Sequence, residues 1–228
     1  FLNFRLKPDA LKQSLQAALG SECPFVLPAK SPRTVVVDFS SPNVAKPMHV
    51  GHIRSTILGD TLARVLRMLG HRVVTDNHIG DWGTQFGMLL LGWKTELNEA
   101  ALKQDPIAEL ERLYKAINAE DSRRDGARAE LVKLQSGDED NLAIWQRMIA
   151  LSQEQFDHVY GRLGVTFDET FGESFYNPQL PGLVEELQGK GIAELSEGAM
   201  VVRFPGDKQL ADKPAIVRKR DGAANYTT

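Results

Sequence analysis

Between residues 38 and 52 the chain reads Asp38-Phe39-Ser40-Ser41-Pro42-Asn43-Val44-Ala45-Lys46-Pro47-Met48-His49-Val50-Gly51-His52. This polar, proline-marked stretch follows the β-branched run 34–37 and precedes a segment, 53–69, in which apolar residues recur every three or four positions. The run predicts a strand covered on both faces of a parallel sheet, and the segment predicts an amphipathic helix that ends at Gly70. A second strand is predicted at 72–76, so the order strand, helix, strand indicates a βαβ unit with a right-handed crossover.

The loop between this strand and helix has the features of a nucleotide site. In open parallel sheets, ligands bind beyond the carboxyl ends of the strands, where this loop lies. The helix beginning near Val50 directs backbone N–H groups and the positive end of its dipole at that place, which favours phosphate oxygens. Gly51 lets a base or ribose approach the backbone, and His49 and His52 fall on one side of the first helical turn. The stretch therefore predicts two imidazole donors aimed at a transferred phosphoryl or nucleotidyl group.

Other polar residues of the loop extend this candidate site. The Asp38 carboxylate can receive a cation, Ser41 and Asn43 can bind an amino group, and Lys46 adds positive charge near phosphates. Ser41 and Asn43 are equally explained as turn or cap residues. Paired histidines also suggest zinc, but no third Cys, His or carboxylate lies at ligand spacing on the helix, so we predict no metal ion held by the protein.

Composition and charge limit the classes of function. A chain of 228 residues with 42% hydrophobic residues is expected to fold as a soluble globular protein. Its net charge of -3 gives no general attraction to nucleic acid, so such contact would need the small basic clusters at 123–128 and 218–220, which also fit a solvated surface. The single cysteine, Cys23, fits a reducing compartment, and the apolar run 88–91 is too short to cross a bilayer. We therefore predict a cytoplasmic protein without a membrane partner.

The rest of the chain is predicted to be mostly helical, with short strands near its end. Helical patterns cover 8–19, 96–134 and 142–163, and the last of these places Trp145, Ile149, Phe156 and Tyr160 on one face. The predicted strands are 1–6, 165–168, 175–178, 199–204 and 215–218, and the last two are expected to share a small sheet. Prolines mark 23–33 as a linker.

Four stretches resemble one known family, in the order expected for it. The run from Ser40 to Thr56 closely resembles the first signature of arginyl-tRNA synthetases, class I enzymes whose general motif reads His-Ile-Gly-His. The other similar stretches are 77–87, 173–178 and 218–226. The resemblance implies an α/β fold, namely the first half of a Rossmann-like parallel-sheet nucleotide-binding fold with a mixed α/β insertion. It divides the chain into the end of a preceding domain with a linker (1–33), the first catalytic half (34–95), the insertion (96–217) and the start of the second half (218–228).

The same resemblance implies an activity and its partners. L-arginine would be activated by ATP, with Mg²⁺ accompanying the nucleotide, to arginyl-adenylate and then transferred to the 3′ end of tRNA(Arg). His49, His52 and Lys46 would be catalytic, with His49, Gly51 and His52 at the ATP. The parent protein is expected to be monomeric.

The resemblance also assigns an arginine pocket. The backbone groups of arginine would meet Ser41, Pro42, Asn43 and His52, and its guanidinium would meet Asp38, Glu197 and Tyr226. The guanidinium is a planar group of hydrogen-bond donors that pairs well with carboxylates and a hydroxyl, which these three side chains supply. Glu197 stands in the turn 196–198, where a solvated carboxylate is the alternative.

The chain departs from the family by stopping before the second half of the nucleotide fold, its Lys-Met-Ser-Lys-Ser-like loop and the anticodon-binding domain. We therefore expect an incomplete fragment that is inactive alone. Two other classes stay open: a small nucleotidylyltransferase with the same histidine loop, and a synthetase-derived binding module without catalysis.

Overall fold

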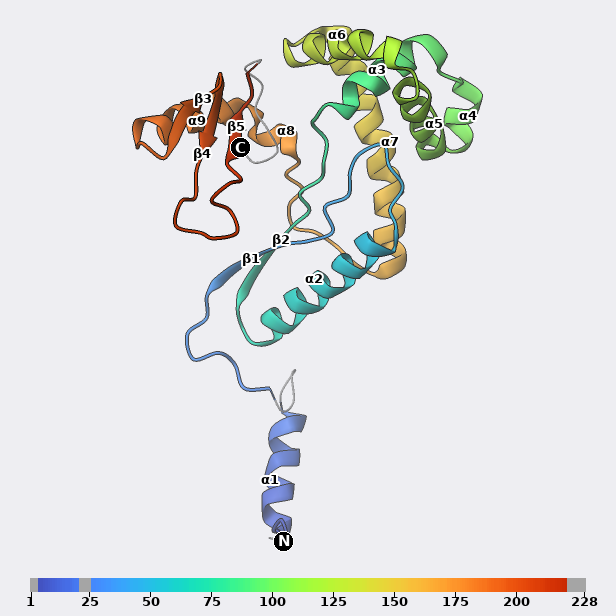
Figure 1. Ribbon diagram of the computed structural model, residues 1–228. Helices are drawn as coiled ribbons and strands as arrows, with labels where there is room; N and C mark the ends of the chain where they lie inside the picture. The colour runs from blue at the N-terminus through green and yellow to red at the C-terminus, as the bar shows by residue number, and fades with distance from the viewer. Residues whose placement is uncertain (1–3, 21–25, 221–228) are drawn as a thin grey trace. The chain divides into compact units, whose positions relative to one another are not determined.

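The computed structural model describes residues 4–20 and 26–220, and the chain divides into two units, 1–172 and 173–228 (Figure 1). The first unit contains α1 (Pro8–Leu19), β1 (Thr34–Asp38), α2 (Val50–Met68), β2 (Arg72–Asp76), α3 (Gln85–Glu96), α4 (Glu99–Gln104), α5 (Pro106–Asn118), η1 (Asp121–Arg123), α6 (Arg124–Gln135) and α7 (Glu139–Leu163). The second contains α8 (Glu173–Tyr176), η2 (Asn177–Gln179), α9 (Leu180–Gly189), β3 (Ala193–Ser196), β4 (Ala199–Val202) and β5 (Ala215–Arg218). Within 4–20 and 26–220, no helix is long and apolar enough to span a membrane.

The predicted strand, helix and strand are confirmed. β1 pairs in parallel with β2, with Thr34 opposite Arg72 and Asp38 opposite Asp76, and α2 connects them. The carboxyl ends of both strands therefore meet at the same edge of the sheet. A further bridge between Asn43 and Gly80 continues the alignment beyond this edge and brings the two following loops together.

Helix α2 packs on the sheet through small residues. Its buried positions are Thr56, Gly59 and Ala63, and a Cβ on Gly59 would lie only 2.1 Å from Cγ of Phe39. Ala63 belongs to the same hydrophobic cluster as Phe39 and Val37. A helix can approach a strand and its loop this closely only where its side chains are small.

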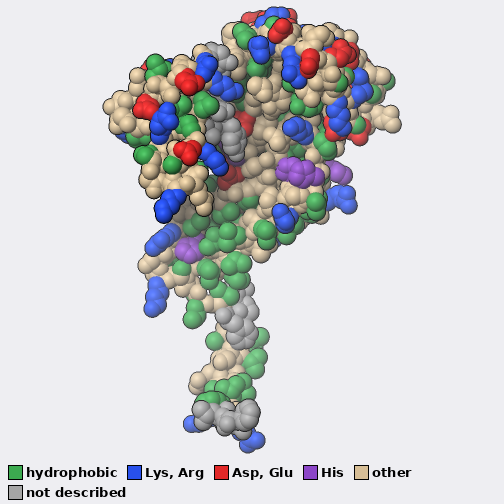
Figure 2. All heavy atoms as spheres, viewed as in Figure 1, with side chains coloured by type: hydrophobic (Ala, Val, Ile, Leu, Met, Phe, Trp, Pro, Cys, Tyr) green, Lys and Arg blue, Asp and Glu red, His purple; other side chains and the backbone are tan. Residues whose placement is uncertain are grey.

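The apolar stripe of α2 and the outer face of β1 differ from the prediction. Coverage of β1 on both faces is wrong for the described residues, because Val36 remains 66% exposed. Leu58 and Leu62 on α2 are also exposed, and hydrophobic side chains lie open along this helix in Figure 2. Successive strand residues alternate between faces, and the helix covers only the face that carries Val37.

Helices α3 to α7 of the first unit form the second part of its core. Phe86 and Leu90 of α3 and Phe156 of α7 are almost fully buried in one cluster, against which Trp145 and Ile149 pack. The predicted apolar face of α7 is therefore confirmed, as is the helical character of 96–134.

The buried carboxylate of Glu130 joins three of these helices. Lys94 of α3 and Lys133 of α6 donate hydrogen bonds to its two oxygens at 2.6 and 2.8 Å, and Asn141 of α7 donates at 3.0 Å. Burial alone would raise the pKa of Glu130, but these hydrogen bonds outweigh it and lower the pKa to about 2. The carboxylate therefore stays charged at neutral pH and holds α3, α6 and α7 together.

The second unit is a three-stranded antiparallel sheet in the order β3-β4-β5 with α9 packed on it. Val184 of α9 lies in one cluster with Met200 and Val217 of the sheet. The prediction that 199–204 and 215–218 contribute strands to a small sheet is confirmed, whereas β3 and α9 were not predicted.

Three predicted strands are wrong in the described residues. Residues 175–178 lie in α8 and η2, because Pro178 fits the first turn of a helix. Residues 165–168 form no strand, although Glu169 makes a single bridge with Asp76. Residues 4–6 are not a strand, and 1–3 lie outside the described residues.

Candidate functional site

The loop that follows β1 has an unusual backbone. Ser40, Ser41 and Ala45 have φ angles of +74°, +50° and +62°, a region that residues with a side chain rarely adopt. Each such residue costs on the order of 1–3 kcal/mol, and the cost is tolerated only where the surroundings fix the conformation. The loop is therefore held in a specific shape by its neighbours.

Backbone hydrogen bonds tie this loop to the loop that follows β2. Ser41 N donates to Oδ1 of Asn77 at 3.1 Å, and Val44 N donates to the Gly80 carbonyl at 3.0 Å. Gly80 N donates to the Pro42 carbonyl at 3.0 Å. Ser41, Pro42 and Asn43 thus share one rigid surface at the carboxyl edge of the sheet.

The two predicted histidines form the beginning of α2. Gly51 N donates to Nδ1 of His49 at 3.1 Å, and His49 N donates to Nδ1 of His52 at 3.2 Å, so each ring caps the helix. The ring centroids are 3.9 Å apart. Figure 2 shows histidine side chains on the surface at the start of this helix. The first turn brings both imidazoles together, as their spacing predicts.

These caps fix the tautomer of both rings. A nitrogen that accepts a backbone N–H carries no proton, so the proton of each neutral imidazole lies on Nε2. His49 and His52 therefore present two Nε2–H donors at the positive end of the helix dipole. Gly51 contributes to this geometry, because a Cβ there would lie 2.9 Å from Cε1 of His49.

The capping role of His52 predicts a pH dependence of stability. Burial, and secondarily the neighbouring His49, lower the pKa of His52 below its ordinary value of 6.5. The unfolded chain then binds a proton at a higher pH than the folded protein, so the free energy of unfolding decreases as pH falls through 6.5 toward the lowered pKa. Urea denaturation from about pH 8 to about pH 5 should show this decrease. The variant His52→Asn should lose this pH-dependent part of the free energy of unfolding. A variant with the same pH profile as wild type would contradict the role of His52.

The residues between positions 38 and 43 that are predicted to bind arginine lie close together at the end of β1 and in the loop after it. Ser41 Oγ donates to Oδ1 of Asp38 at 3.0 Å, and both groups face solvent at least in part. The Asn43 side chain is exposed and occupies the space that a side chain at position 80 would fill, since a Cβ on Gly80 would meet Oδ1 of Asn43 at 2.3 Å. Lys46 instead places Nζ 5.8 Å from the ring centroid of Tyr114 on α5.

The remaining predicted residues belong to the second half of the chain. Glu197 lies in the two-residue turn between β3 and β4, where Glu197 and Gly198 have φ angles of +51° and +84°. Its carboxylate accepts a hydrogen bond from Arg220 at 2.8 Å. A cavity of about 600 Å³ lies here within the second unit, and Arg203 is among its lining residues. Tyr226 lies outside the described residues.

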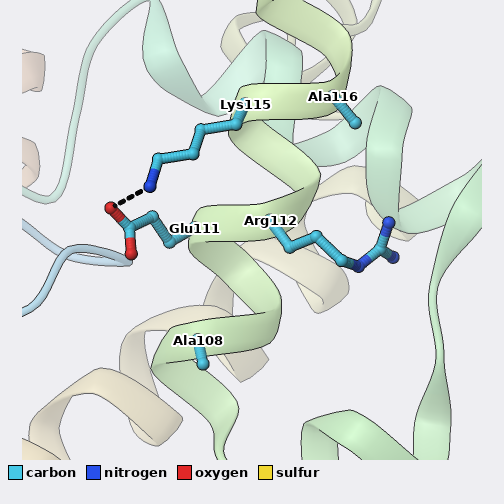
Figure 3. Close-up of a pocket in the computed structure, with 5 residues that line it drawn as sticks. All are labelled: Ala108, Glu111, Arg112, Lys115 and Ala116. Carbon is cyan, nitrogen blue, oxygen red and sulfur yellow. Dashed lines mark ion pairs between the residues drawn. The ribbon is translucent and has the colours of Figure 1, made fainter.

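A second hollow, of about 530 Å³, lies on the surface of α5 and includes none of the predicted residues (Figure 3). Glu111 and Lys115 in its lining form an ion pair with each other at 2.8 Å, while Arg112 points away from that pair toward Glu109. Two alanines complete its lining. Its charges are satisfied locally, so the hollow offers no reason to place a ligand there.

Two residues at the site were not predicted to belong to it. Asn77 holds Ser41 through its amide oxygen, and Tyr160 contacts the hydroxyl of Ser40 at 2.8 Å from α7. Tyr160 was expected only on the core face of its helix. A buried tyrosine usually needs a partner for its hydroxyl, and that requirement is the signal that could have identified it.

A mixed α/β fold with a small parallel sheet, and a histidine-capped helix at its carboxyl edge, place the chain among the class I tRNA synthetases. The family model described as tRNA synthetases class I (R), catalytic domain, matches residues 14–228. The chain belongs to that family.

Relatives and solved structures agree with this family. The chain is 45% identical over 237 residues to the arginine–tRNA ligase of Thermosynechococcus vestitus and 44% identical over 232 residues to that of Fusobacterium nucleatum. Both alignments cover 100% of this chain, which spans about 40% of the length of these relatives. The arginyl-tRNA synthetase of Plasmodium falciparum matches 98% of the chain and 39% of its own, with a TM-score of 0.77 and 31% identity. The arginyl-tRNA synthetase of Thermus thermophilus matches 98% of this chain and 38% of its own, with a TM-score of 0.70 and 26% identity.

Proposed function

We propose that this chain is the part of an arginine–tRNA ligase that activates arginine with ATP. In this reaction a carboxylate oxygen of L-arginine bonds to the α-phosphorus of ATP, pyrophosphate leaves, and the arginyl group of the adenylate then passes to the 3′ end of tRNA(Arg). The observation that carries the proposal is the pair of Nε2–H donors on His49 and His52 at the start of α2, beyond the strand ends.

The chemistry of the transfer needs donors where negative charge develops. The two histidine Nε2–H groups would bind the phosphates of ATP while pyrophosphate departs, and Gly51 would lie against the nucleotide. Lys46 would add charge after leaving the ring of Tyr114, a contact of modest strength. Magnesium is usually held by substrate phosphates, and the described residues contain no group of three metal-ligating side chains of their own, so Mg²⁺ would enter with ATP.

The arginine pocket is proposed in the loop after β1. Ser41, Pro42 and Asn43, with His52, would meet the amino and carboxyl groups of arginine. Asp38 is exposed at the strand end and would take the guanidinium.

Glu197 and Tyr226 are also proposed as residues that bind a guanidinium. The Glu197 carboxylate accepts a hydrogen bond from the guanidinium of Arg220 in this structure, so it would bind arginine by exchanging that partner for the substrate guanidinium. We assign the chain the first half of a Rossmann-like nucleotide-binding fold at 34–95, an insertion at 96–217, a preceding segment at 1–33 and the start of the second half at 218–228. The parent protein is proposed to be a cytoplasmic monomer.

Pyrophosphate exchange by the full-length gene product tests this function. With ATP and tRNA(Arg) present, exchange is expected with L-arginine and not with lysine or citrulline, which lack the charged guanidinium fork. Equal exchange with several amino acids would refute the arginine assignment. Nucleotidyl transfer to another small molecule without amino acid would favour a nucleotidylyltransferase, and absence of exchange would favour a binding module.

A further inference from the structure

Helix α7 supports the two loops of the site at three points along one face. Trp145 Nε1 donates to the Asp81 carbonyl at 2.8 Å, and Ser152 Oγ accepts from Ala45 N at 3.0 Å. Two turns further on, the Tyr160 hydroxyl lies 2.8 Å from Ser40 Oγ. The contacting residues of α7 recur at spacings of seven and eight, which places them on one stripe of the helix.

The contact made by Tyr160 belongs to a buried network. Nδ2 of Asn77 donates to the Tyr160 oxygen at 3.1 Å, and the hydroxyls of Ser40 and Thr56 are 2.8 Å apart. Thr56 Oγ1 also lies 2.7 Å from the carbonyl oxygen of His52. All four side chains in the network are at most 6% exposed, so water does not replace a lost partner easily.

These hydrogen bonds form a continuous chain from the His52 carbonyl to Asn77. Thr56 Oγ1 donates to the His52 carbonyl oxygen and also to Ser40 Oγ. Asn77 Nδ2 donates to the Tyr160 oxygen, and either hydroxyl can be the donor between Tyr160 and Ser40. Burial raises the pKa of Tyr160, so its hydroxyl stays protonated and able to share this bond with Ser40.

We propose that Tyr160 is a positioning residue that holds the arginine-binding loop in its left-handed conformation at Ser40 and Ser41. Asn77 links Ser41 to the tyrosine, because its Oδ1 accepts from Ser41 N while its Nδ2 donates to Tyr160. This inference rests on the function proposed above. Without the tyrosine hydroxyl, Ser40 loses the hydrogen-bond partner that opposes the strain of its φ angle of +74°, and the loop relaxes.

The variant Tyr160→Phe in the full-length gene product separates positioning from stability. Loss of one buried hydroxyl is expected to raise the KM for arginine in pyrophosphate exchange about tenfold. The KM for ATP should change by less than about twofold, because the caps of His49 and His52, in which Tyr160 takes no part, remain to hold the first turn of α2. The matched control is Phe156→Leu, which removes buried volume one turn away on the same helix and has no hydrogen bond to the loop.

Phe156→Leu should lower the melting temperature and leave the KM for arginine unchanged. A double-mutant cycle with Ser40→Ala adds a second readout: if both residues act through one bond, the double variant should have the same KM for arginine as either single variant. Equal losses of arginine and ATP affinity in Tyr160→Phe, or a shift in arginine KM by Phe156→Leu of the same size, would overturn the positioning role. Wild-type protein without arginine-dependent exchange would instead refute the proposed function, and this inference with it.

Discussion

Replacing His52 by asparagine is expected to lower arginine-dependent pyrophosphate exchange by about 10²- to 10³-fold and to leave the helix α2 folded. The asparagine amide oxygen can occupy the position of Nδ1, so it can still accept from His49 N and cap the helix. It has no group at the position of Nε2, so the donor to the phosphates is lost. The measurement is kcat for exchange, with circular dichroism and urea denaturation to show that the fold persists.

Two further variants test whether the loss of activity comes from the missing Nε2 donor. His52→Gln places an amide near the position of Nε2 and should retain more activity than His52→Asn. His158→Ala removes an exposed histidine of α7 that lies outside the site, and it should behave as wild type. Full activity of His52→Asn would show that the Nε2 donor has no part in the reaction.

The second large effect is expected at Gly59, where substitution by alanine should decrease the free energy of unfolding by about 3 kcal/mol. An added Cβ would meet three atoms of Phe39 at 2.1, 2.3 and 2.5 Å. The ring of Phe39 cannot swing away easily, because it is buried and its centroid lies 4.7 Å from that of Phe167. Helix α2 must therefore move off the loop, and His52 at its first turn moves with it.

Urea denaturation measures this loss, and Gly161→Ala is its matched control. Gly161 lies inside α7, and a Cβ there would meet nothing within 4 Å. That substitution should stabilise the protein by about 0.5–1 kcal/mol, since alanine has the higher helix propensity. The double variant with Phe39→Leu should recover part of the loss at Gly59. A Gly59→Ala protein as stable as wild type would contradict the close packing of α2.

The sequence was sufficient to predict those features that depend on residues close together in the chain. The parallel strands, the helix between them and the meeting of His49 with His52 all follow from periodicity and spacing. The buried face of α2 could not be predicted in this way. Leu58 and Leu62 have the spacing of a core stripe, yet they are exposed, because the spacing of apolar residues does not say which of them meet a neighbour.

Hydrogen bonds between residues far apart in the sequence are the second feature that could not be predicted. Ser40 and Tyr160 are 120 positions apart, so no local pattern connects them, and two consecutive serines give no sign of the positive φ angles found there. The strand wrongly predicted at 175–178 has a similar cause: aromatic residues favour strands, but the proline that follows them fits the first turn of a helix.

The reciprocal caps of His49 and His52 place the capping atoms of the helix and the proposed reactive groups on the same two imidazole rings, with the cap at Nδ1 and the donor at Nε2. Fraying of the first turn of α2 would break both caps, free both rings to change tautomer and scatter both donors in one local opening. Heat should therefore inactivate the site before the hydrophobic core melts. Amide hydrogen exchange at Gly51 would record that opening directly, as a loss of protection that precedes global unfolding.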